Sequence, residues 1–213
     1  METETQTSAY IWFDAEYTDL DLDRARLLQV AAIATDVHLN RLLPPDQDFI
    51  AFVRLPATAD AVSPWVREHL AEVVTTCQSD RAVDVDEVDK LLVQWLGRAV
   101  PSAAGHKSSR PVLAGNSIHA DWFLARKYLP EFMRCLHYRL FDVTTLKLLW
   151  QDWMGRPKFD KENAALVRQY FPGAGAAVAG QRHDAYYDVQ ASIAELAFYR
   201  VSMLGRPSEH PQA

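Results

Sequence analysis

The sequence predicts an α/β fold of three layers, in which a mixed central sheet is flanked by helices. The first observation is a near-continuous apolar run at Leu27 to Val37 (LLQVAAIATDV), typical of a strand buried on both faces. The second is that segments with apolar residues at helical spacing, such as Asp84 to Val100, alternate with short strand-like runs. The third is that 49% of the 213 residues are apolar, enough for a sizeable core. Strands and helices mixed in this way pack as helices on a buried sheet.

Five segments are expected to form the sheet. They are Tyr10 to Glu16, Leu27 to Val37, Phe49 to Leu55, Pro111 to Asn116 and Leu140 to Val143. The first segment is rich in aromatic residues, and the third (FIAFVRL) alternates less cleanly between apolar and polar residues. Asn40 and the pair Pro44-Pro45 mark a turn between the second and third strands.

Helices are expected over most of the remaining chain. Ser63 and Pro64 form an N-cap followed by proline at the first helical position, which predicts a helix from Trp65 to Cys77. Further helices are expected at Asp84 to Val100, His119 to Tyr128, a short stretch after Pro130, Thr144 to Gly155, Phe159 to Tyr170 and His183 to Leu204. The last one stops at Gly205-Arg206-Pro207. Pro101 to Pro111 is expected to be a polar loop, and the glycine-rich stretch Phe171 to Gln181 a mobile loop.

The composition excludes some classes of protein. The net charge of −6, from 28 acidic and 22 basic residues, argues against tracking long duplexes by many phosphate contacts. It admits a small anionic substrate held by metals and a few hydrogen-bond donors. No run reaches the roughly 18 to 20 apolar residues of a membrane-spanning helix, so a membrane protein is not expected. Cys77 and Cys135 form no zinc motif and are interpreted as reduced intracellular thiols.

One domain is expected over residues 10–204, between a flexible N-terminus (1–9) and a disordered tail (205–213). The first residues, METETQTSAY, have no basic region followed by an apolar one and no arginine-rich amphipathic presequence. This pattern favours a cytoplasmic protein, with the mitochondrion as the alternative.

The first chemical signal is the pair Asp14 and Glu16 on the first predicted strand. Side chains alternate along a strand, so residues two apart point to the same face. Two neighbouring carboxylates on a strand flanked by Ile11 and Phe13 repel each other and lose hydration, and a divalent cation relieves both costs. Taken alone, an acid pair of this spacing is more often a solvated pair at a strand end.

Two further acids and a histidine favour the metal interpretation. Asp121 lies near the start of a predicted helix, just after the strand that ends in Gly115-Asn116-Ser117. Asp188 lies in the last helix, five residues after His183, so the histidine must sit at or before the first helical turn to share a site with it. Four carboxylates and one histidine match two-metal phosphodiester hydrolysis, in which acids hold two cations about 3.5 to 4 Å apart. The imidazole would accept the proton of the attacking water.

Three blocks of the chain carry a family pattern. They are Asp14-x-Glu16, the segment Leu113 to Lys147 (LAGNSIHADWFLARKYLPEFMRCLHYRLFDVTTLK) and the segment His183 to Arg200 (HDAYYDVQASIAELAFYR). These blocks resemble oligoribonuclease, the branch of the DEDDh 3′→5′ exonucleases that degrades small RNA, which has a ribonuclease H-like fold. The resemblance covers roughly residues 10 to 204 and is weak from 43 to 110.

The resemblance implies a role for each matching residue. Metal ligands for two divalent cations, Mg²⁺ or Mn²⁺, would be Asp14, Glu16, Asp121 and Asp188, with His183 as the general base. A cap on the 5′ phosphate of the substrate would consist of Ser117, Arg139 and Thr144. Tyr138 would reach the site of a partner subunit in a homodimer, Leu20 would wedge beside the bases, and Trp65 would contact a base. A phosphate cap at a fixed distance from the metals would act as a ruler that favours very short oligonucleotides.

One departure from the family concerns the turn after the acid pair. The usual D-L-E-M-T-G-L-D reads D-A-E-Y-T-D-L-D here, so Asp19 replaces a turn glycine. Aspartate tolerates the left-handed conformation better than most residues do. Its extra negative charge near a phosphate site should weaken binding unless the side chain points outward.

The sequence therefore predicts a homodimeric, metal-dependent 3′→5′ exoribonuclease that acts on dinucleotides and short single-stranded RNA and releases 5′-mononucleotides. One alternative is a DEDDh exonuclease that acts on longer RNA or on DNA. Another is a catalytically weak relative that binds short RNA, although all five expected catalytic residue types are present.

Overall fold

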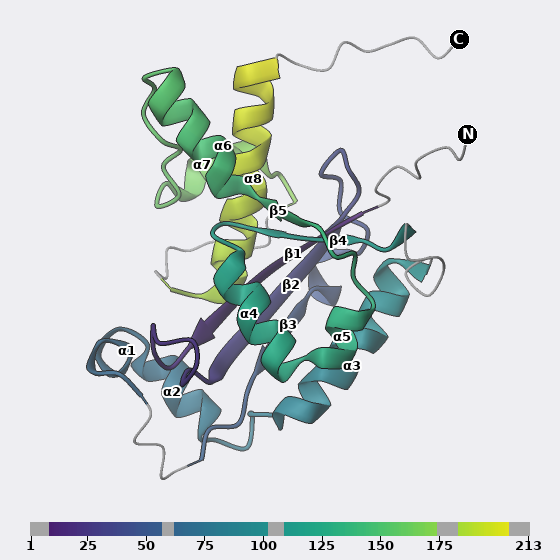
Figure 1. Cartoon of the computed structure of the whole chain (residues 1–213), viewed down its shortest axis with the longest axis vertical. Helices are drawn as coiled ribbons and strands as arrows, with labels where there is room; N and C mark the ends of the chain where they lie inside the picture. The colour runs from purple at the N-terminus through teal and green to yellow at the C-terminus, as the bar shows by residue number, and fades with distance from the viewer. Residues whose placement is uncertain (1–8, 57–61, 102–108, 174–182, 205–213) are drawn as a thin grey trace.

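The five predicted strands form one mixed sheet at the centre of the molecule (Figure 1). The computed structural model describes residues 9–56, 62–101, 109–173 and 183–204. The strands are β1 (Tyr10–Tyr17), β2 (Leu27–Thr35), β3 (Phe49–Phe52), β4 (Val112–Gly115) and β5 (Leu140–Asp142), and their order in the sheet is β3–β2–β1–β4–β5. The central strand β1 is antiparallel to β2 and parallel to β4, which confirms the mixed sheet.

Helices cover both faces of the sheet. They are α1 (Pro64–His69), α2 (Ala71–Cys77), α3 (Val85–Ala99), α4 (His119–Tyr128), α5 (Pro130–Arg134), α6 (Val143–Leu148), α7 (Ala164–Tyr170) and α8 (Ala185–Leu204), with a 3-10 turn η1 (Pro45–Gln47) and a π-helical turn η4 (Leu149–Trp153). Helices α3, α4 and α5 share one core cluster with the sheet, and α6, α7 and α8 share another on the opposite face. The three-layer α/β prediction is therefore confirmed.

Alternation along β1 decides which side chains reach which face. Ile11, Phe13 and Ala15 belong to the core under α3, α4 and α5, whereas Trp12 belongs to the core under α8. Asp14 and Glu16 have the same parity as Trp12, so they point toward the α8 side of the sheet. The strand thus buries apolar residues on one face and directs its two acids toward the C-terminal helix.

Two predicted helices differ in their bounds. The single helix expected from Trp65 to Cys77 is two helices, because Leu70 (φ −118°, ψ 29°) departs from helical geometry and buries its side chain in the cluster shared with Val66. The helix expected from Phe159 begins only at Ala164. Phe159 is buried in the aromatic core under α8 instead, ahead of an asparagine N-cap.

Other predicted segments fall partly outside the described residues. These include residues 1–8 and 205–213, together with most of the two loops expected at 101–111 and 171–181. At the N-terminal side, Ala9 is buried and its carbonyl oxygen accepts a hydrogen bond from the amide of Val112 at 3.1 Å. Ala9 is therefore packed against the start of β4, directly ahead of β1.

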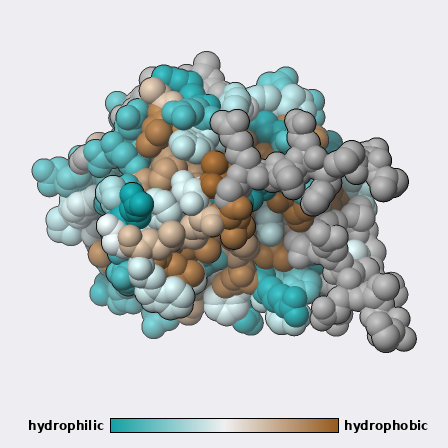
Figure 2. Space-filling view, turned by 90° about the horizontal axis from the view of Figure 1, so that it is seen from above, coloured by the Kyte–Doolittle hydropathy of each residue, from teal (hydrophilic) through white to brown (hydrophobic). Residues whose placement is uncertain are grey.

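One end of the molecule carries exposed apolar side chains. Figure 2 looks onto the end where α6 and the C-terminal part of α8 lie, and it shows hydrophobic residues gathered in the middle of that face. Leu148, Trp153, Met154 and Leu204 are large apolar residues that are at least half exposed. In the described part of the chain, no helix has the length and apolar character needed to cross a membrane.

Candidate active site

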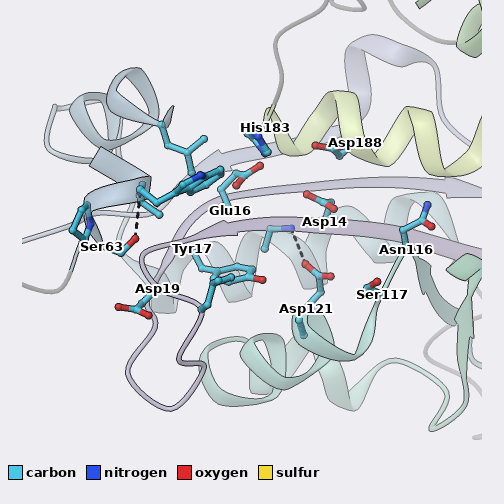
Figure 3. Close-up of a pocket in the computed structure, with 17 residues that line it drawn as sticks. Asp14, Glu16, Tyr17, Asp19, Ser63, Asn116, Ser117, Asp121, His183 and Asp188 are labelled. Atoms are coloured by element: carbon cyan, nitrogen blue, oxygen red, sulfur yellow. Dashed lines mark hydrogen bonds between the residues drawn. The ribbon is translucent and has the colours of Figure 1, made fainter. Parts of the chain in front are cut away.

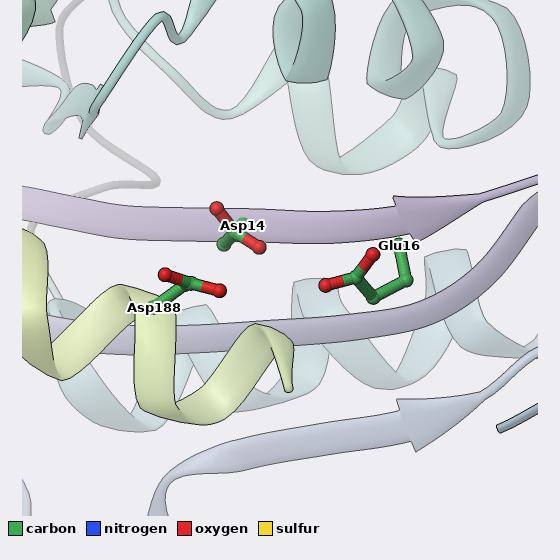
Figure 4. Close-up of side chains that lie close together, drawn as sticks. All are labelled: Asp14, Glu16 and Asp188. Atoms are coloured by element: carbon green, nitrogen blue, oxygen red, sulfur yellow. The ribbon is translucent and has the colours of Figure 1, made fainter. Parts of the chain in front are cut away.

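Three of the predicted metal ligands meet at the C-terminal half of β1. Asp14 and Glu16 point from the strand toward Asp188, which lies in the first turn of α8 (Figure 4). One carboxylate oxygen of each residue lies within 4.8 Å of those of the other two. Oxygen ligands from carboxylates are what Mg²⁺ and Mn²⁺ prefer, so this arrangement fits a divalent cation.

The fourth acid, Asp121, is fixed to the same strand by a hydrogen bond. The parallel pairing of β1 with β4 covers only Tyr10 to Trp12, so the amide of Ala15 has no partner in β4. The Oδ1 atom of Asp121 accepts a hydrogen bond from this amide at 2.9 Å (Figure 3). Asp121 is only 6% exposed, and this bond holds its carboxylate beside the acids of β1.

Close packing of β4 on β1 depends on Gly115. A Cβ atom at this position would lie 2.9 Å from the carbonyl oxygen of Phe13 and 2.9 Å from a terminal carbon of Ile118. Such contacts would push β4 away from β1. The glycine therefore lets the chain turn beside β1 and start α4, which brings Asp121 to the strand.

His183 lies just before α8, as its spacing from Asp188 required. It adopts a left-handed backbone conformation (φ 62°), and α8 begins two residues later at Ala185. Its imidazole packs edge-on against the indole ring of Trp65, with 4.9 Å between ring centroids. Figure 3 shows His183 on the same side of the cleft as Asp188 and Glu16.

The start of α8 is tied to β2 by Gln29 and Asp184. Asp184 accepts a hydrogen bond from the amide of Tyr187 at 3.0 Å, so it caps the helix, and its other oxygen accepts one from Gln29. The side-chain oxygen of Gln29 accepts a hydrogen bond from the amide of Ala185. Gln29 pairs with Glu16 in the sheet, so these bonds place the helix end beside the acids of β1.

Burial and mutual repulsion make the four acids hard to ionise. Burial raises the pKa of Glu16 to about 8, and the charges of Asp188 and Asp121 add to this effect. Burial likewise raises the pKa of Asp121 to about 7, against the hydrogen bond from Ala15. The pKa of Asp14 lies well above its usual value, first because of burial and then because of the neighbouring acids. The pKa of Asp188 is also raised by burial.

These shifts indicate that the protein itself does not fully neutralise the cluster: the charge of Lys161 lowers the pKa values of Asp14 and Asp188, yet both stay above their ordinary value. In the described residues, no lysine or arginine nitrogen lies within 4.0 Å of any of the four carboxylates. Positive charge supplied from outside would remove both the repulsion and part of the burial cost. The donor set therefore fits divalent cations.

A pair of hydroxyl groups lies next to the acids, where β4 and β5 end. The side-chain oxygens of Ser117 and Thr144 are 3.2 Å apart. Asp142 holds both residues, because its Oδ1 atom accepts the amides of Ser117 and Thr144, each at 2.9 Å. Ser117 has a left-handed backbone (φ 51°), which turns it toward the cleft after Asn116.

All five predicted catalytic residues line one cleft of about 690 Å³. Ser117, Leu20 and Trp65 line it as well, with Leu20 88% and Trp65 48% exposed. Thr144 is not among the lining residues, but its hydroxyl oxygen lies 3.2 Å from that of Ser117. Arg139 and Tyr138 are not among the residues that line this cleft; the Arg139 guanidinium lies over the Tyr138 ring at 5.7 Å, and Tyr138 is 80% exposed.

The altered turn after β1 forms without a left-handed residue at Asp19. Among the described residues, only Leu39, Ser117 and His183 have a positive φ without being glycine. The carboxylate of Asp19 accepts a hydrogen bond from the amide of Asp21 at 2.9 Å. Figure 3 shows this side chain directed away from Asp14 and Asp121. The substitution therefore adds its charge at the rim of the cleft.

A further acid beside the site, Glu195, was not identified from the sequence. Glu195 in α8 is fully buried and accepts hydrogen bonds from Asn116 and Tyr199, each at 2.9 Å. Lys147 and Lys161 lie 3.6 and 3.8 Å from its carboxylate oxygens. Asn116 also donates to Ser192 and lines the cleft. The available signal was the seven-residue spacing from Asp188, which places both acids on one helix face.

The fold and the acid-lined cleft define an exonuclease domain, and comparisons with known proteins agree. A model of the exonuclease family (RNase_T) matches residues 11–196. The chain is 32% identical over 195 residues to the oligoribonuclease of Francisella tularensis subsp. novicida, covering 91% of this chain and 95% of that protein. It is 28% identical over 208 residues to the mitochondrial oligoribonuclease of Bos taurus, covering 97% and 78% respectively. The structure of S. pombe Pop2p in its Mg²⁺- and Mn²⁺-bound form has the same fold (TM-score 0.61, 12% identity, covering 94% of this chain and 86% of that one).

The chain belongs to the oligoribonuclease family of exonucleases, as its sequence blocks predicted. It is accordingly an exoribonuclease, a hydrolase with a ribonuclease H-like fold.

Proposed function

We propose that this protein is a metal-dependent 3′→5′ exoribonuclease that degrades dinucleotides and short oligoribonucleotides to 5′-mononucleotides. The observation that carries the proposal is that one cleft joins the acid cluster and His183 to Ser117, whose hydroxyl lies beside that of Thr144. A cleft with a cation site and a nearby cluster of phosphate-binding donors suits a substrate with few phosphates.

Asp14, Glu16, Asp121 and Asp188 would hold two divalent cations, Mg²⁺ or Mn²⁺. The oxygens of Asp14, Glu16 and Asp188 converge, all four acids are partly or fully buried, and their pKa values are raised, so binding of cations would relieve their repulsion. When bound, such cations supply Lewis acidity toward the scissile phosphate and the attacking water. Pop2p, which has this fold, has a structure in a Mg²⁺- and Mn²⁺-bound form.

His183 would accept the proton of the attacking water. It precedes α8 and packs on Trp65, so its ring is held at the edge of the acid cluster. A neutral imidazole has an ordinary pKa of about 6.5, which suits a proton acceptor near neutral pH. His183→Ala should lower turnover by a factor of about 10² to 10⁴, typical for loss of a general base.

Ser117, Thr144 and Arg139 would bind the 5′ phosphate, while Leu20 and Trp65 would contact the bases. The two hydroxyls already lie together, and Asp142 fixes the backbone of both residues. Arg139 is exposed, so its guanidinium can move to a terminal phosphate, for which its planar donors are suited. Leu20 and Trp65 line the same cleft, where exposed apolar side chains can pack against bases.

A homodimer would complete the site through Tyr138. This tyrosine is 80% exposed and does not line the cleft of its own subunit, as a residue that acts on a partner's site should not. The molar mass in solution, measured by light scattering, tests this part of the proposal. A monomer at micromolar concentration that retains full activity would contradict it.

The function is tested by a product time course on a 5′-phosphorylated diribonucleotide with Mn²⁺ or Mg²⁺. We expect release of 5′-mononucleotides that stops when a chelator is added. The same enzyme on a 20-mer RNA and on a DNA dinucleotide separates the proposal from an exonuclease for longer RNA or DNA. Faster turnover per site on the 20-mer than on the dinucleotide would overturn the preference for short substrates.

A further inference from the structure

Asn116 lines the catalytic cleft, and the proposed function gives it no role. It follows Gly115, the last residue of β4, and its side chain is half-buried. Figure 3 shows it on the wall of the cleft next to Asp14. The same side chain also reaches away from the cleft to the buried carboxylate of Glu195. Asn116 therefore connects the cleft to the interior of the protein.

The buried partners of Asn116 fix the orientation of its amide. Its Nδ2 atom donates to the hydroxyl oxygen of Ser192 and to the Oε2 atom of Glu195, each at 2.9 Å. A carboxylate flanked by two lysines, as Glu195 is by Lys147 and Lys161, accepts hydrogen bonds and donates none. The nitrogen of the amide must therefore face Glu195. This leaves the Oδ1 atom of Asn116 as an acceptor on the other side of the amide.

This acceptor meets the hydroxyl of Thr144. The two oxygens are 3.4 Å apart, and only the hydroxyl carries a proton, so Thr144 is the donor. The contact is long for an O–H···O bond, so it orients the hydroxyl more than it stabilises it. With its proton turned to Asn116, the Oγ1 atom of Thr144 presents its lone pairs to Ser117, whose amide it accepts at 2.8 Å.

Ser117 is left as the residue whose hydroxyl can donate into the cleft. It is exposed and lines the cleft, whereas Thr144 does not. Its amide donates to the Oγ1 atom of Thr144 and also to the Oδ1 atom of Asp142, at 2.8 and 2.9 Å. These two acceptors hold Ser117 in its left-handed conformation (φ 51°). The position of its hydroxyl thus depends on Thr144, and that of Thr144 on Asn116.

We propose that Asn116 is a positioning residue for the phosphate cap. Anchored on Glu195, it orients the hydroxyl of Thr144, which in turn holds Ser117 where its hydroxyl donates to the 5′ phosphate. This role rests on the proposed function, because it requires that the cap binds a phosphate. A hydrogen bond from Ser117 to a charged phosphate is stronger than one between neutral groups, so a small displacement of the donor has a measurable cost.

The test compares kcat/KM for a diribonucleotide with and without its 5′ phosphate. Ser117→Ala should lower the preference for the phosphorylated substrate about tenfold or more, because a hydrogen bond to a charged group is lost. Asn116→Ala and Thr144→Val should lower it about threefold to tenfold, mainly by raising KM for the phosphorylated substrate. Thr144→Ser keeps the hydroxyl and should stay within about twofold of the wild type.

A double variant separates positioning from an independent effect. If Asn116 acts through Ser117, adding Asn116→Ala to Ser117→Ala should change the phosphate preference by less than about twofold. Tyr199→Phe is the matched control. It removes the hydrogen bond to Oε1 of Glu195 and leaves Oε2, the oxygen that Asn116 contacts, so the preference should stay within about twofold.

Three results would overturn the role of Asn116. They are equal losses on both substrates in Asn116→Ala, additive losses in the double variant, and a loss of phosphate preference in Tyr199→Phe as large as in Asn116→Ala. If Asn116→Ala does not fold, Thr144→Val decides, and an unchanged preference in it refutes the role. A wild-type chain without phosphate preference would refute the cap of the proposed function, whereas a preference that survives Asn116→Ala refutes the positioning role alone.

Discussion

Helix α8 carries two carboxylates, one buried (Glu195) and one half-buried (Asp188), in opposite surroundings. Glu195 is fully buried and surrounded by Lys147, Lys161, Tyr199 and Asn116. Asp188, two turns earlier on the same face, lies instead beside the other acids of the cleft. Lysine nitrogens lie within 4.0 Å of Glu195, whereas in the described chain none lies that close to Asp188.

The difference teaches how to tell a structural acid from a functional one. A buried charge that meets its counter-charges within the chain stabilises the fold only when the whole set is present. A buried acid left among other acids raises the free energy of the folded chain, and this cost is retained where a ligand removes it. Burial alone therefore does not identify the active site; the missing counter-charge does.

The largest expected effect comes from changing the charge at Asp188. Asp188→Asn keeps the shape of the side chain but removes one of the proposed cation ligands, so turnover of a diribonucleotide should fall to background while the chain stays folded. Glu195→Gln, the matched change two turns later, should leave turnover measurable, because Glu195 does not line the cleft. Initial rates, with circular dichroism as the folding control, check both. Wild-type turnover by Asp188→Asn would contradict the comparison.

The second expected effect is a loss of stability, and it concerns Glu195 instead of Asp188. Glu195→Ala leaves two lysines and Asn116 without their carboxylate, and breaking a buried pair in this way costs about 3 to 5 kcal/mol. Lys147 and Lys161 remain 22% and 27% exposed, so the loss should fall toward the lower end. Urea denaturation measures it. Glu87→Ala, which breaks an exposed pair with Lys90, should cost about 0.5 kcal/mol or less. Equal losses for both variants would refute the structural role of Glu195.

The third prediction concerns pH and cations. The pKa values of Glu16 and Asp121 rise to about 8 and about 7 on folding, from ordinary values of about 4. Between these limits the unfolded chain binds fewer protons than the folded chain, so the stability of the metal-free protein should fall as pH rises from about 4 to 8. Mn²⁺ should oppose this fall. The difference in Tm with Mn²⁺ and with chelator should therefore widen from pH 5 to pH 8, and a constant difference would contradict the assignment.

The smallest effect is a gain in stability from an inactivating change. Asp14→Asn removes one of the repelling charges, so the metal-free variant should be more stable than the wild type at pH 8 by about 0.5 to 2 kcal/mol. It should also lose the response of Tm to Mn²⁺. Thermal unfolding in chelator and in Mn²⁺ tests both statements. A destabilised variant would mean that Asp14 has a partner important for the fold.

Much of the site could be predicted because its residues lie in recognisable local patterns. Alternation along β1 predicted that Asp14 and Glu16 share a face, and the spacing of His183 and Asp188 predicted that the histidine precedes the helix. Each of these two features depends on a single strand or helix. The hydrogen bond from the amide of Ala15 to Asp121 could not be predicted in this way, because it depends on where the pairing of β1 with β4 stops.

What could not be predicted depends on contacts between distant segments. Lys147 and Lys161 meet Glu195 only after α6, α7 and α8 pack together, and nothing local marks them as its partners. The break at Leu70 arises because its side chain is buried against β2, which overrides the helical pattern. Phe159 likewise lies ahead of α7 and not within it, because its side chain is buried in the aromatic core.

The route by which Asp188 reaches the cleft has a consequence for protein synthesis. Asp14 and Glu16 lie on the first strand of the fold, whereas Asp188 belongs to its last helix. A ribosome builds the chain from its N-terminus, so an incomplete nascent chain lacks one of the four acids and cannot assemble the cation site. The four acids of the cleft are therefore complete only after the ribosome has made the last helix of this domain.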